Sequence, residues 1–130
     1  MFRAETRGIV VTVHPDYLPH ESNPDELRWV WSYRVEIENR SRTTVQLLSR
    51  RWLITDAHGT RREVAGQGVV GEQPIIPPGA DYAYTSGCPL PTPSGIMEGT
   101  YRMVTDAGEL FDVTVPTFSL DLPDIARVLN

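Results

Sequence analysis

Residues 29–38 carry the pattern that most constrains the fold, a strict alternation of large apolar side chains with mostly polar ones. The apolar side chains stand at every second position: Trp29, Trp31, Tyr33, Val35 and Ile37. A period of two places them on one face of an extended strand, whereas a helix would spread them around its axis. We therefore expect a strand whose aromatic stripe lies in a core, rather than an aromatic surface for ligand binding.

Other short apolar segments are separated by turn-forming residues. The chain holds 10 glycines and 11 prolines in 130 residues, and no stretch of ten residues has an amphipathic helical pattern. Besides 29–38, strands are expected at 7–13, 43–55, 60–65, 81–86, 100–105 and 109–115, with a further alternation at Phe118, Leu120 and Leu122. This pattern predicts an all-β fold, an immunoglobulin-like or fibronectin type III-like β-sandwich of about seven strands, in one domain spanning 1–130.

Four local details follow from the same patterns. His14-Pro15 should end the first strand, because proline cannot donate to a strand ladder. The alternation in 43–55 changes parity, which predicts a bulge near 47–49 or a strand that changes sheets. Three prolines predict that 87–95 is a loop. The chain end, 123–130, could close with one short helical turn.

Composition excludes several classes of function. The net charge of −5 argues against nucleic acid as a partner, since that task needs positive charge along a phosphate backbone. The paired arginines at 50–51 and 61–62 are expected to form a solvated hairpin rim. No apolar segment is long enough for a signal peptide or a membrane span. With a single cysteine, the chain is expected to be cytoplasmic and not inserted in a membrane.

The segment 64–79 contains a G-x-G-x-x-G pattern at Gly66, Gly68 and Gly71. In dinucleotide-binding folds such glycines let the backbone approach pyrophosphate, and a following helix offers its N–H groups. Here three prolines stand within 74–78, which leaves no room for that helix. We therefore interpret the segment as a ligand- or partner-binding loop comprising Gly66, Gly68, Val69, Val70, Gly71, Glu72 and Gln73. Binding of a pyrophosphate or nucleotide by the amides of 66–71 is the alternative.

No catalytic or metal-binding pattern is apparent. His14, His20 and His58 show no ligand-pair spacing. Cys88 has no histidine near it in the sequence, and Ser86 lacks the G-x-S-x-G context of a nucleophile. We expect a protein that is not an enzyme, with no cofactor and no dedicated metal site.

Longer motifs then resemble those of the bacterial ApaG proteins. They cover most of the chain: 45–56 (VQLLSRRWLITD), 66–74 (GQGVVGEQP), 76–79 (IPPG), 84–87 (YTSG), Leu90, Thr92-Pro93, 95–97 (GIM), Gly99, Tyr101, the strand 29–39 and the closing 115–120 (VPTFSL). The middle motif is long enough to be specific.

The resemblance implies a fibronectin type III-like sandwich and a link to cobalt and magnesium efflux. A chain without a membrane span cannot itself be the transporter, so that link would be indirect. ApaG-like domains are also appended to eukaryotic F-box and polymerase-interacting proteins, which suggests protein interaction as the shared task. The sequence therefore predicts a non-enzymatic binding domain for a protein partner, acting through loops or a sheet edge. A free edge strand would also let two copies pair as a homodimer. A sensor of divalent cations is a third hypothesis.

Overall fold

The computed structural model describes residues 1–123, most of which lie in strands. The nine strands are β1 (Phe2–Thr6), β2 (Ile9–Tyr17), β3 (Trp29–Asn39), β4 (Val45–Asp56), β5 (Arg61–Gln67), β6 (Ile75–Ile76), β7 (Asp81–Leu90), β8 (Gly95–Thr105) and β9 (Leu110–Leu120), with short 3-10 turns η1 (Pro19–Glu21) and η2 (Pro24–Glu26). The sequence predicted about seven; β1 and β6 are the two additional strands. No helix in the described residues is long and apolar enough to span a membrane.

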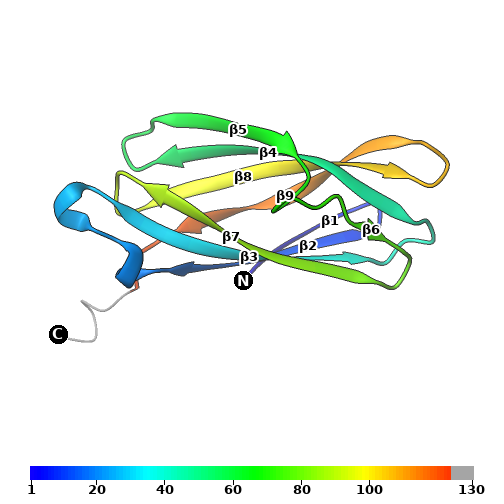
Figure 1. Cartoon of the computed structure of the whole chain (residues 1–130), viewed down its shortest axis with the longest axis horizontal. Helices are drawn as coiled ribbons and strands as arrows, with labels where there is room; N and C mark the ends of the chain where they lie inside the picture. The colour runs from blue at the N-terminus through cyan, green and yellow to red at the C-terminus, as the bar shows by residue number, and fades with distance from the viewer. Residues whose placement is uncertain (124–130) are drawn as a thin grey trace.

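The strands form two antiparallel sheets that pack face to face (Figure 1). One sheet has the order β1-β2-β3-β7, and the other has β5-β4-β8-β9 with β6 also paired to β4. The predicted all-β sandwich is therefore confirmed. On one side of the sandwich, the Thr114 backbone N–H donates to Thr6 Oγ1 at 3.1 Å, which joins β9 to β1. On the other side, Arg62 of β5 donates to the carbonyl oxygen of Pro89 in β7 at 3.1 Å.

The alternating face of β3 lies in the core, as predicted. Tyr33 of the first sheet contacts Trp52 of the second edge-on, with ring centroids 5.5 Å apart. Trp52 also meets Phe118 at 6.0 Å in a T-shaped arrangement. Edge-to-face contacts of this kind add to the gain from burying the rings, so this aromatic cluster ties the two sheets together.

A buried hydrogen bond joins the sheets beside this cluster. The hydroxyl groups of Tyr84 in β7 and Tyr101 in β8 are bonded to each other. Burial raises the pKa of both phenols, so both stay protonated across the ordinary pH range. One hydroxyl therefore donates and the other accepts, and neither polar group is left unpaired in the core.

Two strand boundaries predicted from proline are wrong. β2 continues through Pro15, which pairs in register with Tyr33. β1 begins opposite Val13, so at Pro15 the strand has no neighbour on its other side to need an N–H donor. The first four residues predicted as the loop 87–95 belong to β7, where Pro89 is tolerated because β7 is an edge strand. The helical turn predicted at 123–130 lies, apart from Pro123, outside the described residues.

We predict that Tyr84→Phe lowers the free energy of unfolding by about 1–3 kcal/mol, because the Tyr101 hydroxyl then stays buried without a partner. The double variant Tyr84→Phe/Tyr101→Phe should lose less free energy of unfolding than the two single variants summed, because it leaves no buried hydroxyl without a partner. Urea denaturation of the four proteins gives this coupling energy. Strictly additive losses would show that the two hydroxyls do not stabilise each other.

Candidate functional site

A bulge in β4 organises the glycine-rich segment, and its position at 47–49 confirms the prediction from parity. Leu47 pairs with Met103 of β8, and Ser49 pairs with the adjacent Arg102, so Leu48 is an extra residue in the ladder. Because of this extra residue, Leu47 and Trp52 both face the core although their sequence parity differs. The bulge also separates the two partners on the outer edge of β4, since β5 pairs from Ser49 onward and β6 pairs at Val45 and Gln46.

The carbonyl oxygen of Leu48 anchors both ends of the segment that joins β5 to β6. It accepts a hydrogen bond from the Gly68 backbone N–H at 2.8 Å and another from the Gln73 side-chain amide, also at 2.8 Å. Gln46 returns a bond from its side-chain amide to the carbonyl oxygen of Gln73 at 3.2 Å. The loop is therefore closed on the bulge rather than hanging free from the strand ends.

Between these anchors the backbone makes one tight turn. Val69 and Glu72 exchange two backbone hydrogen bonds, at 2.8 and 2.9 Å, and Val70 and Gly71 form the tip. Both tip residues have positive φ, 43° for Val70 and 81° for Gly71, as in the two-residue turns of β-hairpins. The Val69 side chain is completely buried and fixes the turn to the core.

Arg50 holds the same loop from the core-facing side of β4, so the solvated rim predicted for 50–51 is wrong at this residue, and its contact with the loop was missed. It lies on the core-facing side of β4, the parity of Trp52, and its guanidinium donates to the carbonyl oxygens of Gln67 at 3.2 Å and Gly68 at 2.9 Å. A Cβ at Gly66 would lie 2.9 Å from this guanidinium. The sequence signal for this role is that Arg50 lies an even number of residues from the core-facing Trp52. Arg51 lies on the opposite face and pairs with Glu63 in solvent, as expected of a rim.

The turn projects an apolar residue into solvent. The exposed fraction of Val70 is 55%, and that of Ile75, at the start of β6, is 64%. Glu72, the acidic residue of the turn, is also exposed. Loss of solvent around Tyr82 on β7 raises the pKa of that phenol, and the nearby Glu72 carboxylate raises it further. The turn therefore presents a valine beside a carboxylate on a well-anchored backbone.

The predicted loop residues fall into two groups. Gly66 belongs to the end of β5, while 68–73 form the anchored turn and its flanks. The N–H groups of Gly68, Val69 and Glu72 donate to backbone carbonyl oxygens of this chain. These three donors are not directed at a common point outside the loop, and the strand β6, rather than a helix, follows.

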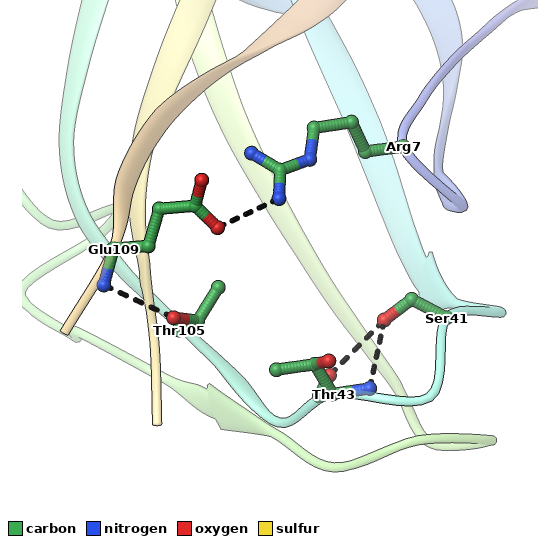
Figure 2. Close-up of polar contacts among 5 residues, drawn as sticks. All are labelled: Arg7, Ser41, Thr43, Thr105 and Glu109. Atoms are coloured by element: carbon green, nitrogen blue, oxygen red, sulfur yellow. Dashed lines mark hydrogen bonds and ion pairs between the residues drawn. The ribbon is translucent and has the colours of Figure 1, made fainter. Parts of the chain in front are cut away.

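A hollow lies at the end of the sandwich where the β1–β2, β3–β4 and β8–β9 connections meet (Figure 2). Its volume is about 240 Å³. Arg7 pairs with Glu109 at 2.8 Å beside it, and the hydroxyls of Ser41 and Thr105 bond to nearby backbone groups. Arg7, Glu109, Ser41 and Thr105 thus have partners within the chain.

Among the described residues, the remaining reactive side chains do not gather at one place. Cys88 is 2% exposed, and burial raises the pKa of its thiol. Within residues 1–123, no three His, Cys, Asp or Glu side chains are grouped so that they could hold a metal ion. The anchored turn is therefore the candidate functional site.

The sandwich and the anchored glycine-rich turn can now be compared with known proteins. A family model described as the ApaG domain matches residues 19–105, more than half of the chain. The chain belongs to the ApaG domain family. Proteins named ApaG from Methylobacterium sp. (strain 4-46) and Allorhizobium ampelinum are 55% and 57% identical to it over 130 residues, covering all of each chain. A crystal structure titled putative ApaA protein, from Bordetella pertussis, is 45% identical with a TM-score of 0.87, covering 89% of this chain and 94% of that one. The resemblance read from the ApaG motifs is thus confirmed.

We predict that Gly68→Ala destabilises the fold more than Gly71→Ala does. Both glycines have positive φ, but a Cβ at Gly68 would lie 2.3 Å from the backbone oxygen of Glu72, whereas a Cβ at Gly71 meets nothing within 4 Å. Gly71→Ala should cost about 1 kcal/mol in the free energy of unfolding, from backbone strain alone. Gly68→Ala must also shift the turn, and faster hydrogen exchange at the Val69 amide should accompany its larger loss of stability. Equal losses from the two variants would contradict this account of the turn.

We further predict that millimolar inorganic pyrophosphate, with or without Mg²⁺, causes no localised shift of the backbone amides of 66–73. The reason is that Gly68, Val69 and Glu72 already donate within the chain and Glu72 adds a negative charge. Titration followed by amide NMR signals measures this, with ADP as a second ligand. Saturable shifts confined to 66–71 would instead favour the nucleotide-binding alternative.

Proposed function

We propose that this chain is a non-enzymatic protein-interaction module whose contact surface is the turn Val69–Glu72. The observation that supports this most directly is Val70, an exposed β-branched residue held at positive φ. Such a backbone conformation suits glycine or asparagine and is strained for valine by about 1–3 kcal/mol. With 55% of its surface exposed, Val70 gains little from burial that would offset this strain. A contact made by its side chain with a partner accounts for a valine at this position.

The anchoring of the turn supports the same function. Val69 inserts into the core, and the two bonds to the Leu48 carbonyl oxygen hold the flanks. A loop that is already ordered loses little conformational entropy when a partner binds, so even a small contact surface can be effective. Loops on a rigid β-scaffold are the usual place for recognition residues in sandwiches of this type.

The cellular role follows from this proposal. We place the protein in the cytoplasm, where it acts through a protein partner and not through nucleic acid. The link of ApaG proteins to cobalt and magnesium efflux is then indirect, because the partner carries out or controls the transport. No enzymatic step is assigned, since the one thiol is buried, which raises its pKa, and residues 1–123 hold no group of side chains that could bind a metal ion.

We predict that Val70→Asn stabilises the fold and removes the partner. Asparagine tolerates the left-handed backbone, so the free energy of unfolding should rise by about 1 kcal/mol. The proteins captured from a bacterial lysate by the immobilised wild-type chain should be lost with this variant. The matched control is Leu110→Asn, which alters a residue of similar exposure, 56%, at the start of β9, with β4 and β8 between it and β6. If Val70→Asn retains every protein that Leu110→Asn retains, the turn is not the contact surface.

A further inference from the structure

Strand β5 is an open edge that the rest of the described chain leaves uncovered. In residues 1–123, β5 pairs with β4 alone, and it lies at the margin of the molecule (Figure 1). All of its seven residues are exposed except Gly66, which is half-buried. Val64 shows this most clearly, because it shares the core-facing parity of Trp52 and yet is 37% exposed. An open edge of this length is a template for another strand.

The hydrogen-bonding pattern shows which residues face the open side. At one end of the β4–β5 hairpin, the Asp56 N–H donates to the Thr60 carbonyl oxygen, and at the other the Gly68 N–H donates to that of Leu48. Backbone groups of an antiparallel strand point alternately to its two sides, so the even-numbered residues of β5 bond to β4. The odd-numbered residues therefore present their N–H and C=O groups outward: Arg61, Glu63, Ala65 and Gln67.

We propose that a second copy of this chain pairs with this edge, the two β5 strands running antiparallel about a two-fold axis at Val64. Side chains that face each other across an antiparallel pair must share a face, so the axis must pass through a residue rather than between two residues. An axis at Glu63 would oppose two carboxylates, and one at Arg62 would oppose two guanidinium groups. An axis at Val64 opposes two valines and pairs all seven residues of the strand.

The other residue pairs in this register are also compatible with antiparallel pairing of the two β5 strands. Arg62 faces Gly66 of the second copy, which has no side chain of its own but is covered by the guanidinium of that copy's Arg50. Arg62 is held away from it by its bond to the carbonyl oxygen of Pro89 in its own chain. Arg61 faces Gln67, and Glu63 faces Ala65. Glu63 already has a partner within its own chain, because Arg51 donates two hydrogen bonds to its carboxylate at 3.0 and 3.1 Å. No two like-charged residues of the paired β5 strands lie directly opposite each other, and each open backbone group in the strand gains a partner.

The edge strand β7 of the opposite sheet is a poorer template. β7 contains Pro89, which has no N–H to donate, and the carbonyl oxygen of Pro89 is already bonded to Arg62. Pairing through β5 joins the β5-β4-β8-β9 sheets of two copies into one continuous sheet. This inference goes beyond the proposed partner contact, because the turn 69–72 lies past the end of β5 and takes no part in the pairing.

The test is site-directed cross-linking with matched controls. In the proposed register Val64 forms a non-hydrogen-bonded pair with its copy, with Cβ atoms about 5 Å apart, close enough for a disulfide after a small adjustment. Val64→Cys should form a covalent dimer under mild oxidation at least about tenfold faster than Val70→Cys, which is no less exposed and lies outside the register. The native Cys88 is 2% exposed and does not compete. Equal rates for the two variants would overturn the proposal.

Equilibrium sedimentation of the unmodified chain provides the second measurement. We expect a concentration-dependent dimer that Ala65→Pro abolishes, because Ala65 directs its N–H to the open side and not to β4. Circular dichroism shows whether that variant folds. If Ala65→Pro does not fold, Val64→Arg takes its place, because it puts two positive charges next to each other at the two-fold axis. Val70→Arg is the control for that variant. A wild-type chain that stays monomeric up to millimolar concentration, or a dimer unaffected by Val64→Arg, would show that β5 is not the interface. Loss of the dimer with lysate capture unchanged would separate this inference from the proposed function.

Discussion

The extra residue in β4 is the constraint on which the candidate site depends. A regular strand would place either Leu47 or Trp52 in solvent, and the bulge at Leu48 allows both to enter the core. The displaced backbone also leaves the Leu48 carbonyl oxygen directed at the outer edge of the sheet. There it accepts hydrogen bonds from Gly68 and Gln73, so the irregularity that completes the core also fixes the loop.

The three glycines of the G-x-G-x-x-G pattern serve three separate packing needs. Gly66 leaves space for the guanidinium of Arg50, Gly68 allows the close approach of the Glu72 backbone, and Gly71 takes the second left-handed position of the turn. None of these needs involves a phosphate. The same letters thus arise in a β-hairpin-like turn from the close contact of side chain and backbone, which is why the pattern requires its surrounding strand and helix before it indicates a nucleotide site.

Much of the fold was predictable because strand period and burial coincide. The stripe on β3 and the bulge each leave a signal within a few residues. Pro15 and Pro89 misled the prediction because proline interrupts a strand only where a neighbour needs its N–H, and whether a neighbour is present depends on distant segments. The role of Arg50 and the strained φ of Val70 were hidden for the same reason. Both depend on where the backbone of 66–73 runs, and local propensity does not determine that path.

The closure of the loop on one carbonyl oxygen also affects how freely this part of the chain can vary. Gly68 and Gln73 both bond to the Leu48 carbonyl oxygen, so the ends of the four-residue segment between them are fixed. They stay fixed when the residues at the tip of the turn are changed. Under the proposed function, substitutions at 70 and 71 need to satisfy only the turn geometry and the contact with the partner. The tip can therefore change without rebuilding the core, provided that position 69 continues to fill the space that Val69 occupies.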